Sequence, residues 1–125
     1  MIALIQRVSY AKLLVDDKPF SQIDGGILAL IGIEKADVKS DSEKLLNKIL
    51  DYRIFNDEDG KMNLSVRDIG GCLMLVSQFT LAAQTMNGLR PSFSSAKRPK
   101  EAEEIYNYLV EITNKTYEKT AFGKF

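Results

Sequence analysis

Apolar residues gather in short runs over the first third of the chain, a pattern typical of β-strands. We expect strands over residues 2–8, 11–15 and 20–23, with residues 16–19 forming a turn of Asp, Asp, Lys and Pro. Residues 27–33 are apolar on both faces, which is typical of a central strand covered on each side. The pattern therefore predicts an antiparallel start followed by a buried strand.

Two later segments repeat apolar residues at helical spacing. We expect the first helix over residues 41–51, where Ser40 and Glu43 match a capping box. The second is expected over residues 99–114, with Pro99 in its first turn. Its apolar stripe consists of Ala102, Ile105, Tyr106, Leu109 and Ile112. A stripe of this kind packs on a sheet and belongs to the core.

Between and after these segments the pattern is weaker. Residues 52–55 predict a short strand, residues 56–61 a polar turn, and residues 122–125 the start of a further strand. Residues 82–99 are small, polar and basic and predict no regular structure. Four basic residues lie in this stretch or directly after it and form either a local positive patch or an ordinary solvated surface: Arg90, Lys97, Arg98 and Lys100.

The most apolar run of the second half, residues 72–76, ends in Ser77, Gln78, Phe79 and Thr80. A buried strand that ends in hydroxyls, an amide and unpaired backbone N–H groups is a common position for a small-molecule site. The alternative is that these residues only begin a loop. We select Ser77–Thr80 as the candidate site.

The composition of the chain limits the kinds of catalytic and metal site that it can form. The chain has 125 residues, 17 basic and 17 acidic side chains, and no histidine, so it reads as one domain without the positive field of a protein that wraps a long duplex. Its one cysteine, Cys72, lies in an apolar run and is expected to be buried. A catalytic triad, a Cys-His pair and a His/Cys zinc site are therefore excluded. Without a signal peptide or a membrane span, the sequence predicts a cytoplasmic protein.

Five segments, in the same order along the chain, resemble the D-aminoacyl-tRNA deacylase family: residues 1–8, 53–55, 60–65, 76–81 and 90–93. Ser77-Gln78-Phe79-Thr80-Leu81 is similar to a signature motif of that family. The resemblance implies an α/β fold with a curved, mostly antiparallel sheet backed by two helices, in a homodimer. It also implies hydrolysis of the ester between a D-amino acid, or glycine, and the terminal adenosine of tRNA, without a cofactor or metal.

For that reaction we assign roles within Ser77–Thr80. Backbone N–H groups of Phe79 and Thr80 would stabilise the oxyanion, Gln78 would position the substrate, and Ser77 would be a nearby donor. Thr80 as a nucleophile is the alternative. In the family the terminal 2′-hydroxyl of the tRNA helps to activate water.

The residues expected to bind substrate or tRNA are Arg7, Met62, Arg90, Lys97 and Arg98. In the family the arginine that matches Arg7 braces a Gly-Pro loop, whose motif follows the segment resembling Ala121-Phe122-Gly123. This sequence has no Gly-Pro, and we expect the native protein to continue past Phe125 and to carry one. The alternatives are a non-catalytic module that binds a nucleotide or a tRNA end, and a structural or interaction protein.

Overall fold

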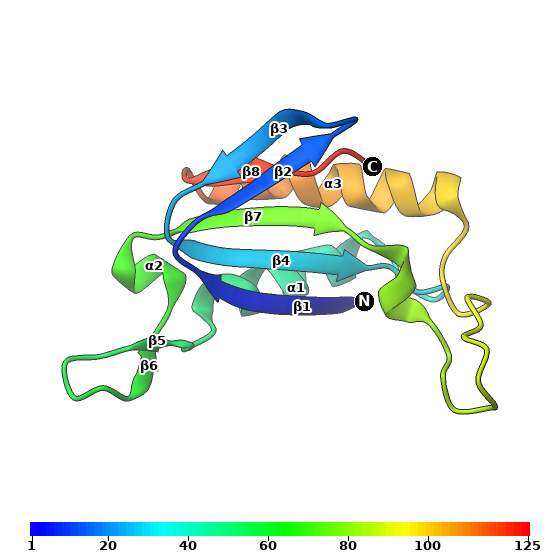
Figure 1. Cartoon of the computed structure of the whole chain (residues 1–125), viewed down its shortest axis with the longest axis horizontal. Coiled ribbons are helices and arrows are strands. Elements are labelled where there is room, and N and C mark those ends of the chain that lie inside the picture. The colour runs from blue at the N-terminus through cyan, green and yellow to red at the C-terminus, as the bar shows by residue number, and fades with distance from the viewer.

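The structure, a computed structural model that describes residues 1–125, is organised around a four-stranded sheet (Figure 1). The strands lie in the order β1 (Ile2–Val8), β4 (Gly26–Gly32), β7 (Cys72–Ser77) and β8 (Thr120–Phe122). β4 and β7, the two central strands, carry the most deeply buried side chains of the sheet. The expected strand over residues 27–33 is confirmed as β4, one residue earlier.

The strand directions differ from the expectation of a mostly antiparallel sheet. β1 runs antiparallel to β4, but β4 and β7 are parallel, and so are β7 and β8. Parallel neighbours require a crossover connection, and a helix lies in each of these two connections. The central sheet is therefore mixed, and antiparallel pairing predominates only when two separate hairpins are included.

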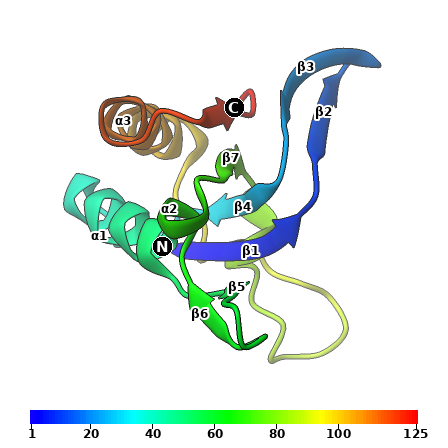
Figure 2. The same ribbon diagram turned by 90° about the vertical axis from the view of Figure 1, so that its left-hand side faces the viewer.

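The first hairpin joins β2 (Ala11–Val15) to β3 (Lys18–Ile23) through Asp16 and Asp17, whose φ angles are 52° and 64°. Two consecutive positive φ angles are typical of the two-residue turn that suits twisted strands. The hairpin curls over the sheet face opposite the long helices (Figure 2), and the Ser21 hydroxyl donates to the Phe122 carbonyl at 3.0 Å. The expected turn was thus too long, because Lys18 and Pro19 already belong to β3.

A smaller hairpin consists of β5 (Phe55–Asn56) and β6 (Met62–Leu64), at one end of the molecule. The short strand expected over residues 52–55 therefore begins only at Phe55. Residues 57–61 form the turn of this hairpin, where the Asp57 carboxylate accepts from the backbone N–H groups of Asp59 and Lys61. This confirms the expected polar turn.

Both long helices, α1 (Lys39–Asp51) and α3 (Pro99–Thr116), cover the same face of the sheet (Figure 2). Their apolar faces and the sheet enclose a core that includes Ile31, Leu50 and Leu109. Both helices were expected, within two residues at each end. The capping box was assigned wrongly, because the Asp41 carboxylate, and not Glu43, accepts from the backbone N–H group at the start of α1.

A third helix, α2 (Val66–Ile69), is a single turn that the sequence pattern did not predict. Ser65 and Asp68 cap it reciprocally, at 3.2 and 2.8 Å, and Gly70 ends it in the left-handed conformation. The hydrogen bonds from Ser65 hold the pKa of the Asp68 carboxyl below its usual value. The helical content is therefore three helices and not two.

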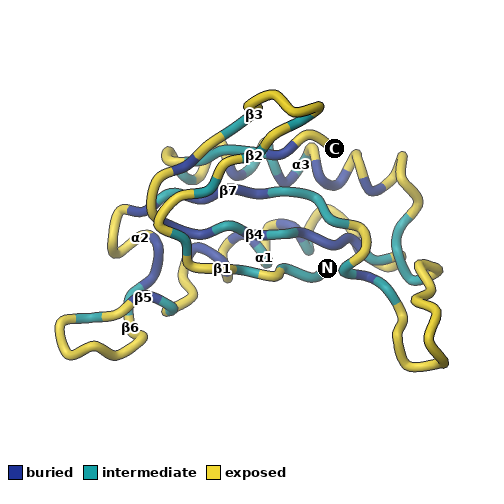
Figure 3. The backbone as a smooth tube through the Cα atoms, in the orientation of Figure 1, coloured by how far each residue is buried: buried dark blue, intermediate teal, exposed yellow.

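Burial follows the layers, with buried backbone along the central sheet and the inner sides of the helices and exposed backbone along the hairpins and the long loop (Figure 3). Cys72 departs from its prediction: it is half-buried, because it lies at the first position of β7, beside an open polar hollow. No helix has the length and apolar character needed to cross a membrane.

Candidate active site

The segment Ser77–Thr80 forms a sharp change of backbone direction at the end of β7. The Gln78 N–H group donates to the Ile31 carbonyl at 2.7 Å and extends the pairing with β4 by one bond. The chain then enters η1 (Phe79–Ala82), a 3₁₀ turn whose first hydrogen bond runs from the Leu81 N–H group to the Gln78 carbonyl at 3.2 Å. The N–H groups of Phe79 and Thr80 precede that bond, so they have no partner within the turn.

Gly32 allows this turn to lie against the end of β4. A Cβ atom at Gly32 would lie 2.8 Å from the Leu81 Cβ atom and 3.4 Å from the Gln78 carbonyl oxygen. The first distance is shorter than two carbon atoms tolerate, so a side chain here would displace η1. The position of the Phe79 and Thr80 N–H groups therefore depends on a glycine in the neighbouring strand.

The side chains of the segment form a small polar group. The Gln78 side-chain amide donates a hydrogen bond to the Thr80 hydroxyl at 2.5 Å. An amide cannot take up the proton of a nucleophilic hydroxyl. This arrangement supports binding by the backbone of η1 and provides no base for Thr80.

A cavity of about 300 Å³, the strand-end cavity, opens beside the segment. Ser77, Gln78 and Phe79 line it, whereas the Thr80 side chain does not. Its other walls come from the end of β4, the loop before α3, α3 itself and the residues after β8: Ile31, Ile33, Lys97, Ala102, Lys124 and Phe125. Its volume is at the lower end of the range for small-molecule sites.

A second cavity of about 500 Å³, the aromatic cavity, adjoins the first and shares Phe79, Lys97, Ala102 and Phe125 with it. The rings of Phe79 and Phe93 meet edge to face there, with centroids 5.4 Å apart. Three of its 10 lining residues are basic: Lys35, Lys97 and Arg98.

The expected basic patch is only partly confirmed. Lys97 lines both cavities, and its ammonium group donates to the Lys35 carbonyl at 2.8 Å. Arg98 lines the aromatic cavity, whereas Arg90 lies exposed on the loop and lines neither cavity. Sequence reasoning missed Lys35 and Lys124, although Lys35 follows the end of β4 at the same sheet edge as Ser77.

The basic residues at the cavities lack acidic partners. The salt bridges of the chain pair other groups: the Met1 ammonium with Glu34 and Asp37, Arg67 with Asp51, and Lys115 with Glu111. Positive charge at both cavities is therefore free to interact with an anion.

The loop over residues 83–98 is held by backbone hydrogen bonds against the residues that follow β4, although the sequence predicted no regular structure there. Gln84 and Ser92 exchange backbone hydrogen bonds at 2.7 and 3.0 Å. Further along, the Lys35 N–H group donates to the Ser95 carbonyl at 3.1 Å, and the Lys97 N–H group to the Ile33 carbonyl at 3.0 Å. These bonds fix the segment with Lys97 and Arg98 beside the end of β4.

Arg7 and Met62 lie away from this group. Arg7 pairs with Ile27 of β4, at the sheet end opposite Ser77. Its guanidinium donates to the Asn56 side chain at 3.2 Å and lies 5.3 Å from the centre of the Phe55 ring. Met62 lies in β6 and is 66% exposed. Within one chain, neither residue lines either cavity.

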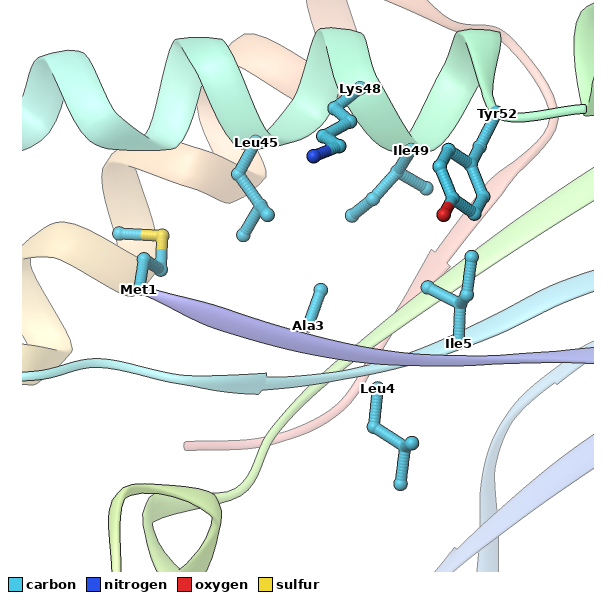
Figure 4. Close-up of a pocket in the computed structure, with 8 residues that line it drawn as sticks. All are labelled: Met1, Ala3, Leu4, Ile5, Leu45, Lys48, Ile49 and Tyr52. Carbon is cyan, nitrogen blue, oxygen red and sulfur yellow. The ribbon is translucent and has the colours of Figure 1, made fainter.

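A further hollow of about 430 Å³ separates β1 from α1 (Figure 4). Apolar side chains such as Ala3, Leu45 and Ile49 surround it, while Leu4 points to the other side of β1. Its lining offers few polar groups beside the Lys48 ammonium and the Tyr52 hydroxyl. It lacks the convergent donors of Ser77–Thr80 and is the weaker candidate for ester chemistry.

Comparison with known proteins identifies the family of the chain as a whole. A family model described as D-Tyr-tRNA(Tyr) deacylase matches residues 4–125. The chain belongs to this family. Among its deacylase relatives, the D-aminoacyl-tRNA deacylases of Dichelobacter nodosus and Photorhabdus laumondii are 52% and 49% identical over 125 residues. Each match covers 100% of this chain and 86% of the relative.

Solved structures agree with the deacylase fold. A structure described as c-Myc DNA Unwinding Element Binding Protein superimposes with a TM-score of 0.92 at 38% identity, covering 98% of this chain and 84% of that one. A probable eukaryotic D-amino acid tRNA deacylase superimposes with a TM-score of 0.77 over 90% of this chain and 66% of that one. At 14% identity the second likeness concerns the fold alone.

Proposed function

We propose that this chain hydrolyses the ester between a D-amino acid, or glycine, and the 3′-terminal adenosine of tRNA, and so removes wrongly charged amino acids. The observation that carries the proposal is the start of η1, where the Phe79 and Thr80 N–H groups lack partners within the turn, beside the strand-end cavity. Deacylase relatives at about half identity over the whole chain give the substrate class.

In this mechanism the ester carbonyl lies against the first turn of η1. Attack by water places negative charge on the carbonyl oxygen, and the N–H groups of Phe79 and Thr80 stabilise it. Gln78 and Ser77 line the cavity and orient the aminoacyl group or its ribose. The terminal 2′-hydroxyl of the tRNA assists the attacking water, so no side chain needs to act as a base.

Lys97 and Arg98 hold the acceptor end of the tRNA through its phosphates, and Arg90 adds positive charge on the exposed loop. Only this end of the tRNA needs to be bound. This agrees with a chain whose 17 basic and 17 acidic side chains cancel.

We further propose that the enzyme works as a homodimer in the cytoplasm. Arg7 and Met62, which we expect to bind substrate or tRNA, lie away from Ser77: Arg7 is at the other end of the sheet, and Met62 is in the β5–β6 hairpin. They can serve a site at Ser77–Thr80 only if a second copy supplies them. Light scattering of the native protein tests this, and a monomer that is fully active would contradict it.

The Gly-Pro segment expected from the resemblance stays a prediction. Arg7 is its expected brace, and Arg7→Ala should then lower the preference for D over L substrates. The intact mass of the native protein, with a peptide map of its C-terminal fragment, tests whether such a segment follows Phe125.

The decisive experiment is turnover. The native protein should release D-tyrosine from D-tyrosyl-tRNA and leave L-tyrosyl-tRNA largely intact, measured by the loss of the aminoacyl ester. A folded protein that binds the charged tRNA without turnover would instead favour the non-catalytic binding module.

A further inference from the structure

The aromatic cavity has no role in the ester chemistry proposed above. That chemistry needs the start of η1 and the strand-end cavity, where Ser77 and Gln78 lie. The aromatic cavity adjoins the strand-end cavity through four shared residues, among them Phe79 and Lys97, and is the larger of the two cavities, at about 500 Å³. A hollow of this size can accept a further part of the substrate.

Its rings are available to a ligand. Phe79 is 61% exposed and Phe93 is 41% exposed. Their edge-to-face contact, at an interplanar angle of 63°, leaves part of each ring uncovered. Exposed aromatic rings in a nucleic-acid site are the usual platform for an unstacked base.

Its charges suit a phosphodiester. The side chains of Lys35, Lys97 and Arg98 line the same cavity, and none of them takes part in a salt bridge. The hydrogen bond from the Lys97 ammonium to the Lys35 carbonyl fixes one of these charges beside the rings. The cavity thus presents an apolar platform and unpaired positive charge together, which is what a nucleotide requires.

We propose that the aromatic cavity binds the nucleotide that precedes the terminal adenosine, which is the last cytidine of the CCA end. Its base stacks on Phe93, and its phosphodiester lies beside Lys97 and Arg98. This inference rests on the proposed function, because the strand-end cavity must hold the terminal aminoacyl ester. The shared wall at Phe79 and Lys97 agrees with two groups that are consecutive in one strand.

Calorimetry with two non-hydrolysable probes tests the inference. The first is 3′-(D-tyrosylamino)-3′-deoxyadenosine, and the second is the same compound extended by one 5′ cytidylyl residue. The extended probe should bind the native protein about tenfold more tightly, as expected for one stacked base. Its affinity should also fall more steeply with salt, because one more phosphate is bound.

Variants assign that gain to the cavity. Phe93→Ala should abolish the tenfold difference, while Phe93→Tyr, which keeps the aromatic ring, should retain it. Leu89→Ala is the matched control, because Leu89 lies in the same loop, is fully exposed and lines neither cavity. Arg98→Gln should remove the additional salt dependence and keep part of the stacking gain. Circular dichroism confirms that each variant is folded.

The outcomes separate this inference from the proposed function. If the native protein hydrolyses D-tyrosyl-tRNA but binds both probes equally, the nucleotide site is wrong and the deacylase stands. Equal loss in Leu89→Ala and Phe93→Ala would also overturn the site. If the protein neither hydrolyses the charged tRNA nor binds the first probe, the proposed function fails, and this inference fails with it.

Discussion

The absence of a side chain at Gly32 allows the geometry of the candidate active site. Gly32→Ala would place a Cβ atom 2.8 Å from the Leu81 Cβ atom and so displace η1. We expect kcat/KM for D-tyrosyl-tRNA to fall by about tenfold or more, since small displacements of catalytic groups are costly. Gly25→Ala is the control, because its nearest atoms would lie at an ordinary 3.8 Å. Unchanged kinetics in Gly32→Ala would contradict the backbone assignment.

The two polar side chains of the segment should differ in importance. Thr80 lines neither cavity, whereas Gln78 lines the strand-end cavity and donates to the Thr80 hydroxyl. Thr80→Ala should therefore keep measurable deacylation, and Gln78→Ala should lose more. Single-turnover rates measure both. A folded Thr80→Ala protein without any activity would revive Thr80 as the nucleophile.

Tyr106 is a buried residue with a testable pH response. Its hydroxyl donates to the carbonyl groups of Leu75 and Gly123, at 3.1 and 3.0 Å, and burial raises its pKa to about 12. The folded state thus favours the neutral hydroxyl, so this contribution to stability is complete below pH 10 and is lost as the pH rises towards 12.

Tyr106→Phe should therefore lower the free energy of unfolding by about 1–3 kcal/mol at pH 7, because the buried Gly123 carbonyl loses this donor. The Leu75 carbonyl loses it too but still accepts from the Gly123 N–H group. The difference in unfolding free energy from the wild type should shrink above pH 10. There the unfolded wild type is stabilised by ionisation of this hydroxyl, whereas the phenylalanine variant has no hydroxyl to ionise. Urea unfolding at several pH values measures both effects. A difference that is constant from pH 7 to 12 would contradict the raised pKa.

At the scale of elements, the amino terminus braces the loop that lines the aromatic cavity. The Met1 ammonium donates to Asp37 at 2.8 Å and to Glu34 at 3.1 Å, and Asp37 also accepts from the Glu34 N–H group at 2.7 Å. Glu34 pairs in turn with Ala96, next to Lys97. Although burial alone would lower it, the pKa of this ammonium is raised, because hydrogen bonds and charge from Asp37 and Glu34 outweigh the desolvation.

Asp37→Asn should destabilise the chain by about 2 kcal/mol at pH 7, the usual cost of a hydrogen bond to a charged group. Because the folded pKa lies above 8.0, the ammonium's contribution is complete below that pH and fades at more alkaline values. The deficit of Asp37→Asn, measured by urea unfolding, should therefore be smaller at high pH. Glu58→Gln, in an exposed turn, is the control.

The sequence patterns predicted elements better than their assembly. The stripe through Tyr106 and the double-sided apolar run through Ile31 are decided by local spacing, and both elements are present. Ser40 and Asp41 both lie near the start of α1, so spacing alone could not identify the capping residue. A buried strand has the same composition in either direction, which is why the parallel pairing of β4 and β7 was missed.

The candidate site was predictable in its centre and not at its edges. Ser77, Gln78 and Phe79 were selected because they end a buried strand, and all three line one cavity. Lys35 joins the aromatic cavity through the docking of a loop about sixty residues further along the chain. No local pattern reports such a contact. Arg7 was proposed from the resemblance, and its position at the far sheet end follows only from strand register.

At the scale of the molecule, the sheet carries both long helices on one face and only a hairpin on the other (Figure 2). Leu4, Leu14 and Phe20 remain about half exposed. Exposed apolar side chains of this size favour association. We expect Leu14→Glu to weaken the proposed homodimer, measured by sedimentation equilibrium, while Lys12→Glu on the same strand should not. An unchanged dimer in Leu14→Glu would exclude the hairpin from the interface.

The parallel pairing of β4 with β7 also governs when activity can arise during synthesis. Ile31 and Ser77 are partners although they lie 46 positions apart, and η1 rests on Gly32 of the earlier strand. Contacts between distant segments form slowly, because a long loop must close before they are made. A growing polypeptide on the ribosome therefore lacks the turn proposed to bind the oxyanion until β7 has emerged and paired, and α3 must follow before the cavity walls are complete. The nascent chain should gain activity late and in one step.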